Sequence, residues 1–588
     1  MMDGWARDGE GRVLDLRLLA RLWPYLRPHG WAFVLGFVLM TFSSVAKLAG
    51  PYVLKLAIDG PIARREPRGL WLYAGLFLAA QAAEALLEAA QTLLVRIRGQ
   101  DVLRALRSDL FAKAQRLPSS YFDATPGGKT LSRITSDVAV LSDFFSSGLV
   151  ALVGDALLLA GILVLLFRLD PRLAVTAYVT LPLLLAASEI FRRQMRAAYR
   201  QTREKTSKLM GKIQEYLRGF EVLRLFAAEP WAEGEFDVAN AEHRDAFLRS
   251  NTLHALFFPL VELLSSVTLA LVLWKGGREV IAGAATLGGL VAFFEYLQKF
   301  FRPLRDLSEK YNILQASMAS IEKISDFLDL PEEASGGGKS LALEGRLDFV
   351  GIEFAYDGGP PVLRGVDVAV APGEVVALVG PTGCGKTTFV HLLLGLYRPR
   401  GGRILVDGVD LAELDPGTFR EQVALVPQDV FLFDDTVVEN VRLGRPGVSR
   451  EAAVEALRAV GLGPSLELLP KGYDTPVLEE GALLSSGQRQ LVAFARALAG
   501  DPKILVLDEA TSEVDQATEG LIEEALERLF QGRTTLVVAH RLATVRRSDR
   551  VVLFAKGRVA EEGTHEELLA RGGLYRTLYE LQFRGEAG

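Results

Sequence analysis

The chain has 588 residues, too many for one domain, and 49% of them are hydrophobic, with a mean hydropathy of +0.21, which is high for a soluble protein. The formal net charge is −6 and gives no support to nucleic acid as a general partner. The single cysteine, Cys384, excludes both an intrachain disulfide and a zinc site built from cysteines.

The first predicted element is an amphipathic helix over residues 12–27. Leucines and a tryptophan lie there at helical spacing, and four arginines occupy the other side. Such a helix lies in the membrane interface, with its apolar side toward the lipid. The first turns of a soluble core helix are the alternative interpretation.

Six long apolar stretches follow, each close to the roughly 20 residues that a bilayer core requires. They cover residues 31–58, 70–95, 144–167, 173–190, 252–274 and 280–301. The short connections between them are residues 59–69, 168–172 and 275–279. Two longer connections, 96–143 and 191–251, are helical in pattern and rich in arginine and lysine, which places them on the cytoplasmic side.

Several of the apolar stretches contain charged residues, namely Lys47, Lys55, Glu84, Glu88, Asp155, Glu262, Glu295 and Lys299. Charges at membrane depth usually pair with one another or face a wet cavity. The spans are therefore predicted to line a polar pathway, although pairing or an interfacial position explains most single charges. Glu84 and Glu88 are one helical turn apart and share a face.

The long connections each contain a break, near residues 117–130 and 213–226. A helix that leaves the membrane, turns and returns forms a tip that can dock on another domain, or simply an ordinary hairpin. After the last span, residues 331–345 contain SGGGKS, which is typical of a flexible linker. The predicted organisation is an interfacial helix in 1–30, a transmembrane domain in 31–325, a linker in 326–345 and a nucleotide-binding domain in 346–585.

The strongest single signal is the stretch GPTGCGKTT, from Gly380 to Thr388, which matches the phosphate-binding P-loop pattern. An apolar β-branched run precedes it and an apolar helical pattern follows it. Its glycines let backbone N–H groups point at phosphate oxygens, and the helix N-terminus adds positive potential. Lys386 can reach the β- and γ-phosphates, and the Thr387 hydroxyl can bind Mg²⁺. The expected nucleotide-binding residues are Gly380, Pro381, Thr382, Gly383, Cys384, Gly385, Lys386, Thr387 and Thr388.

Three weaker signals accompany the P-loop. Tyr356, on a strand-like segment, can stack on adenine, although aromatic residues in strands usually belong to the core. Gln428 follows the strand-like run QVALV and can reach Mg²⁺ or the attacking water, or it is a surface amide. Ser485 and Ser486 precede a strongly amphipathic helix, either as phosphate ligands or as helix caps.

Acidic residues and a histidine end two further apolar runs. Asp508 closes a buried strand and suits Mg²⁺ coordination, and the adjacent Glu509 suits the polarisation of a water that attacks the γ-phosphate. His540 ends the run TTLVVA and can hold the γ-phosphate and orient Glu509. Beside a P-loop, this combination indicates an ATPase.

Together these motifs make the chain resemble an ABC exporter half-transporter over essentially its whole length. In this resemblance Tyr356 is similar to the A-loop, Gly380–Thr388 to Walker A and Gln428 to the Q-loop. LSSGQ at 484–488 is similar to the signature, ILVLDE at 504–509 to Walker B, SEVD with Asp515 to the D-loop, and His540 to the H-loop. The breaks in the long connections then resemble coupling-helix regions.

The resemblance implies an all-α six-helix transmembrane domain with long intracellular helix extensions, followed by an α/β P-loop nucleotide-binding domain. It also implies two nucleotide-binding domains that close head-to-tail around two ATP molecules with Mg²⁺. The signature residues would then contact the ATP that the partner subunit mainly binds; they are Ser485, Ser486, Gly487 and Gln488. Closure would turn the membrane cavity from inward to outward, and hydrolysis would reset it.

The departures from the family pattern lie on the signature side. The usual LSGGQ has Ser486 in place of glycine, and the preceding segment has Leu478 and Glu480 in place of a glycine and a commonly basic residue. The D-loop has Glu513 and Val514 instead of a small residue and leucine. Because this surface serves the opposite ATP site, we favour a heterodimer in which this chain supplies Glu509 to the competent site. A homodimer remains open.

The sequence thus predicts an ATPase in the inner membrane that exports amphipathic compounds such as drugs, lipids or peptides. Its expected cofactors are ATP and Mg²⁺, and its expected partners are a second half-transporter, membrane lipid and the substrate. A homodimeric lipid flippase and an ATP-gated regulator without transport are the alternatives. The six spans argue against a soluble ABC ATPase, and the presence of Glu509 and His540 argues against a gate that only binds ATP.

Overall fold

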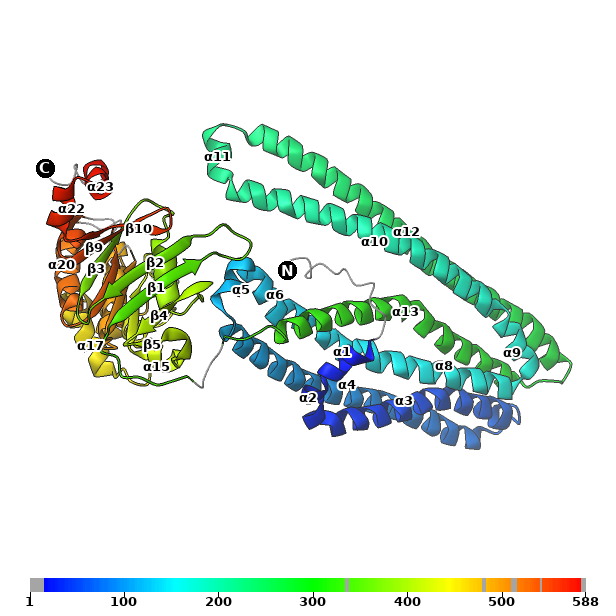
Figure 1. Cartoon of the computed structure of the whole chain (residues 1–588). Coiled ribbons are helices and arrows are strands. Elements are labelled where there is room, and N and C mark those ends of the chain that lie inside the picture. Colours follow the sequence, from blue (N-terminus) through cyan, green and yellow to red (C-terminus); the bar gives the residue numbers. More distant parts are fainter. Residues whose placement is uncertain (1–14, 334–337, 478–482, 509–515, 540–541, 583–588) are drawn as a thin grey trace. The chain divides into compact units, whose positions relative to one another are not determined.

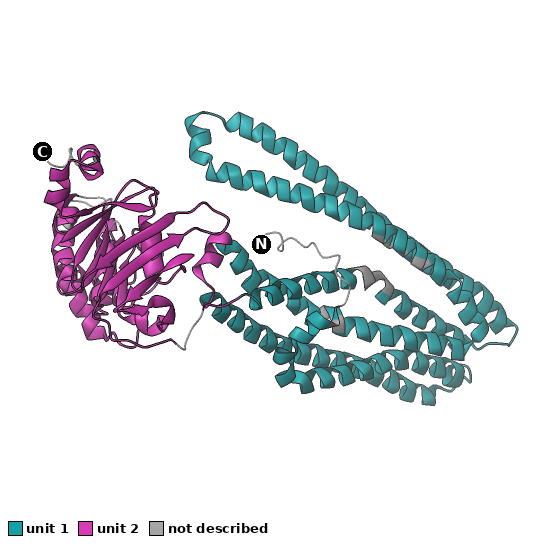
Figure 2. Cartoon of the chain, viewed as in Figure 1, with its two compact units in different colours: residues 1–115, 127–330 teal, residues 116–126, 331–588 magenta. Residues whose placement is uncertain are grey.

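The computed structural model of the chain describes residues 15–333, 338–477, 483–508, 516–539 and 542–582. Figure 2 shows its two compact units, one formed by residues 1–115 and 127–330 and the other by residues 116–126 and 331–588. The first unit is helical. The second contains the β-strands and takes one short helix, α5 (Ser119–Ala124), from the first half of the chain.

The first unit opens with two short helices instead of the single predicted one. They are α1 (Leu16–Arg21), which the Asp15 carboxylate caps, and α2 (Trp23–Leu26). The helix breaks at Leu22 because Pro24 has no N–H to donate to the carbonyl of Ala20.

Six long helical rods make up the rest of this unit (Figure 1). They are α3 (Gly30–Ala57), α4 (Leu70–Gln115), α8 (Leu149–Leu169), α9 with α10 (Pro171–Tyr178 and Thr180–Arg218), α12 (Glu229–Ile281) and α13 (Leu287–Leu328). The short helices between them are α6 (Gly127–Ser132), α7 (Val138–Asp143) and α11 (Phe220–Leu225). Helices α10 and α12 run side by side as a long antiparallel pair that α11 joins at its tip.

Two of the predicted span boundaries were wrong. The stretch 173–190 is divided between α9 and α10, because Pro182 cannot donate to the carbonyl of Tyr178. The predicted loop 275–279 is helical, and the chain instead turns after Ile281, where Gly283 has φ +71°. Thr286 then caps α13 by accepting a hydrogen bond from the Gly289 N–H.

Among the described residues, four helical stretches are long and apolar enough by themselves to cross a bilayer. They are Trp23–Ile62, Pro67–Gln115, Val150–Leu169 and Glu229–Ile281. The remaining two rods are interrupted or more polar, since α9 has only eight residues and α13 carries Glu295, Lys299 and Arg302 in its first half.

Five of the eight charged residues named in the apolar stretches form ion pairs across helix contacts, and pairing was one of the two explanations that the sequence favoured over a polar pathway. Lys47 of α3 lies 3.0 Å from Glu88 of α4, and Lys299 of α13 lies 3.9 Å from Glu84 of α4. Asp155 of α8 accepts a hydrogen bond from Lys310 of α13.

The second unit contains two sheets. The antiparallel sheet has the order β2-β1-β4-β5, with bounds Leu363–Val370, Leu347–Phe354, Gly401–Val406 and Val409–Asp410. The larger sheet has the order β10-β9-β3-β8-β7-β6, with bounds Arg558–Gly563, Arg550–Ala555, Val375–Val379, Thr534–Val538, Ile504–Asp508 and Val423–Val426. Strand β10 is antiparallel to β9, and the other five strands are parallel to one another.

Helices cover the larger sheet because its central strands are apolar on both faces. Along β3, Val375, Ala377 and Val379 pack into one hydrophobic core, whereas Val376 and Leu378 pack into a second. The helices of this unit's main segment are α14 (Lys386–Leu393), α15 (Pro416–Glu421), α16 (Val437–Arg442), α17 (Arg450–Ala459), α18 (Gly463–Glu467), α19 (Ser486–Leu498), α20 (Gln516–Phe530), α21 (Leu542–Arg546), α22 (His565–Arg571) and α23 (Leu574–Gln582).

The described part of the predicted flexible linker is hydrogen-bonded to the second unit. The Lys339 N–H donates to the carbonyl of Glu413, and the Leu343 N–H donates to the Gln422 side chain. Asp407 accepts from three consecutive N–H groups at residues 344–346. The segment from 338 onward is therefore part of the nucleotide-binding unit and not a free coil.

Candidate nucleotide site

The P-loop leaves the fully buried strand β3 and enters helix α14 at Lys386. Gly380, Gly383 and Gly385 have φ angles of +147°, +79° and +108°, which residues other than glycine rarely adopt. A Cβ on Gly380 would lie 2.3 Å from the carbonyl oxygen of Phe554, and one on Gly385 would lie 2.7 Å from Leu363. The loop therefore requires glycine at both positions, and its curvature makes a cradle of backbone N–H groups suited to phosphate.

The three residues after the last glycine have different environments. Lys386 is only 6% exposed, and its ammonium donates hydrogen bonds to the carbonyls of Gly380 at 2.6 Å and Pro381 at 3.5 Å. The Thr387 side chain is exposed, so its hydroxyl is accessible to an ion beside the loop. The buried Thr388 hydroxyl lies 3.0 Å from the Tyr356 hydroxyl.

Tyr356 lies two residues beyond the end of β1 and so is not on the strand itself. Its ring packs edge-on against Phe354 and Tyr397, with centroid distances of 5.0 and 5.3 Å. These contacts and the Thr388 hydroxyl fix the ring beside the P-loop helix. The partly exposed ring is thereby available to stack on a base.

Cys384 is not placed to face a bound phosphate with its thiol. The side chain is buried in the hydrophobic core under the loop, together with Phe389 and Phe554. Burial raises the pKa of the Cys384 thiol, and the nearby Lys386 opposes this shift only in part. Cys384 thus contributes its backbone and packing to the site.

The carboxyl ends of the parallel strands bring the other predicted residues to the same edge of the sheet. Asp508 is the last residue of β7 and is in register with Val538 of β8, which neighbours β3. Gln428 follows β6 by two residues, and its side chain is exposed. Glu509, His540 and Asp515, expected to continue this edge, lie outside the described residues.

The signature segment forms the start of helix α19. The Ser485 hydroxyl accepts a hydrogen bond from the Gln488 N–H at 3.2 Å, and the Gln488 side chain accepts one from the Ser485 N–H at 3.0 Å. This capping box realises the helix-cap alternative for Ser485. Gly487 is buried and Ser486 is exposed at the first turn, where the positive end of the helix dipole favours an anion.

A buried polar junction that the motifs did not predict lies behind this site. Asn440 of α16 is 1% exposed, accepts from the Phe433 N–H and donates to the carbonyls of Phe433 and Thr436. Arg496 of α19 donates to the carbonyls of Asn440 and Phe431, and burial, with a smaller effect of Arg445, lowers its pKa to about 10. The junction ties the loop after Gln428 to the signature helix. In the sequence, the junction is indicated only by the polar Asn440 within the otherwise mainly apolar run VVENV.

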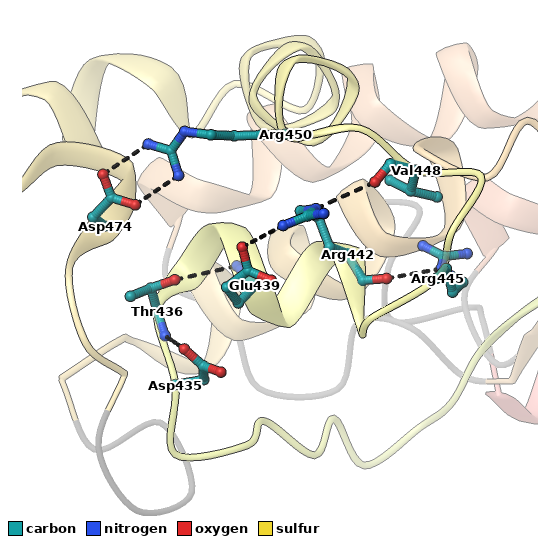
Figure 3. A network of polar contacts seen from close by, with 8 residues as sticks. All are labelled: Asp435, Thr436, Glu439, Arg442, Arg445, Val448, Arg450 and Asp474. Carbon is teal, nitrogen blue, oxygen red and sulfur yellow. Dashed lines mark hydrogen bonds and ion pairs between the residues drawn. The ribbon is translucent and has the colours of Figure 1, made fainter.

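Figure 3 shows the polar network on the outer side of α16. Thr436 caps the helix through the Glu439 N–H, and Arg442 links the Glu439 carboxylate to the carbonyl of Val448. Arg450 pairs with Asp474 through two hydrogen bonds of 2.7 Å. Because both partners are about half exposed, this ion pair fixes geometry more than it adds stability.

The donor set fits ATP with Mg²⁺. Within the described ranges, no three His, Cys, Asp or Glu residues gather as a metal cage. Mg²⁺ bound with a nucleotide needs only one or two protein oxygens besides phosphates and water, and Thr387 and Asp508 offer a hydroxyl and a carboxylate. These residues would hold the ion, which neutralises phosphate charge when bound.

Comparisons with known proteins agree with this geometry. Residues 33–304 match the family model "ABC transporter transmembrane region", and residues 363–512 match the model "ABC transporter". The chain is 37% identical over 577 residues to the uncharacterized ABC transporter ATP-binding protein YknV of Bacillus subtilis, covering 96% of this chain and 94% of the relative. It is 34% identical over 571 residues to the ATP-dependent lipid A-core flippase of Syntrophus aciditrophicus, covering 96% and 95% of the two chains.

A solved structure of a bacterial Atm1-family ABC exporter with ATP bound matches with a TM-score of 0.78 and 28% identity. The match covers 96% of this chain and 99% of that one. The helical membrane domain followed by an α/β nucleotide-binding domain is thus the exporter fold. Since exporters of this kind work as dimers, this chain supplies one half of an ATPase that is coupled to transport. The chain belongs to the ABC transporter family as an exporter subunit that carries its membrane domain and its ATP-binding domain in one multi-pass polypeptide.

Proposed function

We propose that this subunit exports amphipathic compounds, such as drugs, lipids or peptides, by alternating access. One observation carries the proposal: a single chain joins a P-loop and an aligned strand-end carboxylate to apolar helices that hold ion pairs within their length. A helix that serves only as a membrane anchor needs no charges at that depth.

Each candidate site residue that the structure describes has a proposed role in binding the nucleotide or its Mg²⁺. Tyr356 stacks on the adenine, and the N–H groups of Gly380–Thr388 with the Lys386 ammonium hold the phosphates. Thr387, Asp508 and Gln428 hold Mg²⁺ at the carboxyl edge of the sheet. Lys386 is prepared for this role, because its present acceptors are carbonyls of the loop itself, which phosphate oxygens can replace.

The same proposal assigns the signature to the partner's nucleotide. The positive end of helix α19 lies at this turn, and the capping box between Ser485 and Gln488 fixes where the helix begins. The site of one chain is then completed only when the signature of a second chain faces its P-loop. Ser486, in place of the usual glycine, adds a side chain at this exposed turn and supports the heterodimer over the homodimer.

The breaks in the long connections have proposed docking roles. Asp123 of α5 accepts a hydrogen bond from Tyr397, which packs against Tyr356, so α5 reaches the adenine side of its own nucleotide-binding unit. At the other tip, Leu225, the last residue of α11, and Phe226 directly after it are about four-fifths exposed. This apolar tip suits docking on the partner subunit.

A homodimeric lipid flippase is the second candidate. It is favoured by the likeness to the lipid A-core flippase over nearly the whole chain. The two candidates differ in cargo and in the partner, and they share the ATP site.

The test of the function is a transport assay in proteoliposomes with Glu509→Gln as the matched variant. The substitution keeps the side-chain shape and removes the proposed general base. We expect ATP binding to persist and both ATP turnover and ATP-dependent transport of a fluorescent lipid or cationic dye to fall by at least about a hundredfold. Wild-type turnover in the variant would contradict the role of Glu509.

A further inference from the structure

A proline in α3 creates a backbone acceptor inside the membrane domain. Pro51 has no N–H, so the carbonyl of Lys47, four residues earlier, has no helical partner. The Lys299 ammonium of α13 donates to this carbonyl at 3.1 Å. One turn away on α13, the Tyr296 hydroxyl donates to the carbonyl of Leu48 at 2.6 Å. Side chains of α13 thus recognise the opened backbone of α3.

Two ion pairs surround this acceptor. Lys47 lies 3.0 Å from Glu88, and Lys299 lies 3.9 Å from Glu84. We name Lys47, Glu84, Glu88 and Lys299 the intramembrane charge cluster. The cluster contains two positive and two negative side chains, but its donors do not satisfy every acceptor atom. The Oε2 atom of Glu84 is buried and accepts no hydrogen bond.

The cluster lies deep within its helices. At 1.5 Å per residue, Glu84 is about 21 Å from the start of α4, Lys299 about 18 Å from the start of α13 and Lys47 about 26 Å from the start of α3. A bilayer core is about 30 Å thick, so residues this far from the ends of their helices lie far from either membrane surface. A carboxylate oxygen without a donor is costly at that depth.

We propose that the intramembrane charge cluster binds the protonated amine of an amphipathic cargo. This inference rests on the proposed export function and adds the chemistry of the head group. Both lysines already have a carboxylate partner, and Lys299 also has the Lys47 carbonyl. Unused acceptor capacity remains on the buried Glu84 oxygen and on Glu88, whose side chain is 54% exposed. An ammonium group supplies the missing donors, whereas an anionic head would compete with both carboxylates for the lysines.

The experiment compares three lipids of equal chain length that differ only in the head group. Dodecylamine, dodecanol and dodecanoate are titrated against the ATPase activity of the assembled exporter in nanodiscs of uncharged lipid. We expect dodecylamine to stimulate at the lowest concentration. Glu84→Gln should raise its half-maximal concentration at least about tenfold, because a charge-assisted hydrogen bond is lost. The matched control Glu233→Gln, at an exposed glutamate of α12 outside the predicted spans, should shift it less than twofold.

Glu88→Gln is the second variant, for the case in which Glu84→Gln does not assemble. The Glu88 side chain is about half exposed, so this substitution should leave folding intact. We expect it to weaken dodecylamine stimulation and to leave dodecanol unchanged. Equal potency of dodecanol and dodecylamine, or stronger stimulation by dodecanoate, overturns the inference. Failure of the export function is distinguishable, because then no compound shows transport that depends on Glu509.

Discussion

Backbone stereochemistry decides which P-loop residues are replaceable. Gly380 and Gly385 combine a positive φ with no space for a Cβ, whereas Gly383 has a positive φ and open space around it. The pattern G-x-x-x-x-G-K-[ST] gives the first and the last of these glycines equal weight. The structure adds the reason, which is contact with the Phe554 carbonyl in one case and with Leu363 in the other.

Gly380→Ala should therefore abolish nucleotide binding. Its Cβ would lie 2.3 Å from the Phe554 oxygen, so either the loop or β9 must move, and we expect a loss of at least about 2 kcal/mol in the free energy of unfolding. Gly383→Ala is the control, with an expected cost of about 1 kcal/mol from its φ alone. Thermal unfolding and titration with a fluorescent ATP analogue measure both effects. Equal behaviour of the two variants would contradict the steric argument.

Cys384 should react slowly with iodoacetamide in the folded protein. The side chain is 6% exposed, and burial raises its pKa, so less thiolate is present at neutral pH than for a free cysteine. The rate should rise with pH toward the raised pKa, and ATP should slow the reaction further. Since the chain has no second cysteine, the mass increase reports this site alone. A folded-state rate equal to the rate in urea would show that the thiol is exposed.

At the scale of elements, helix α19 joins the signature to the rest of the nucleotide-binding unit. Its N-terminus is fixed by the Ser485–Gln488 capping box, and Arg496 near its C-terminus is bonded to the loop after Gln428 and to α16. The signature and the loop after Gln428 can therefore move together. This connection depends on one buried asparagine that completes the hydrogen bonds of three elements.

Asn440→Ala should destabilise the nucleotide-binding unit by about 3 kcal/mol, because it removes the buried amide that bonds the N–H and the carbonyl of Phe433 and the carbonyl of Thr436. We expect a lower unfolding temperature and reduced ATPase activity. Asn251→Ala, at an exposed asparagine of α12, is the same change without buried partners and should alter the free energy by less than about 0.5 kcal/mol. Similar losses in both variants would argue against the junction.

At the scale of the whole molecule, the proposed dimer completes the ATP site of each chain. In that dimer the signature turn of α19 faces a nucleotide held by another chain, and the exposed residues at the α11 tip, Leu225 and Phe226, meet the partner. The assembly must therefore supply both contacts. We expect the signature face, where Ser486 departs from the family pattern, to decide whether the partner is a second copy or a different chain.

The chain purified by itself should show little ATPase activity, and addition of a second half-transporter should restore it. The reason is that a heterodimer places this chain's P-loop against the partner's signature, whereas a homodimer would use the altered LSSGQ twice. The test measures ATPase activity as a function of the mixing ratio of the two half-transporters. The activity should be highest when they are present in nearly equal amounts. Full activity of the single chain at micromolar concentration would establish the homodimer.

Hydrophobic patterning was sufficient to predict the helical domain and the positions of most rods, because apolar length at membrane scale has few other solutions. It failed at 173–190 and 275–279, where a proline and a glycine turn decide how helices end. The P-loop, the strand that bears Asp508 and the signature helix followed from motifs whose chemistry is local in sequence. Glu509 and His540 remain predictions from such motifs.

The sequence by itself indicated nucleotide binding, since the nine residues Gly380–Thr388 carry a contiguous P-loop pattern. Only the tertiary structure decided which charges meet. The Lys299 ammonium contacts a carbonyl more than 200 positions away because Pro51 opens α3 at the depth where α13 passes. Asn440 likewise acquires its role only where α16, α19 and the loop after Gln428 converge. The sequence gives the type of every side chain, but the tertiary structure decides which donors and acceptors find a partner.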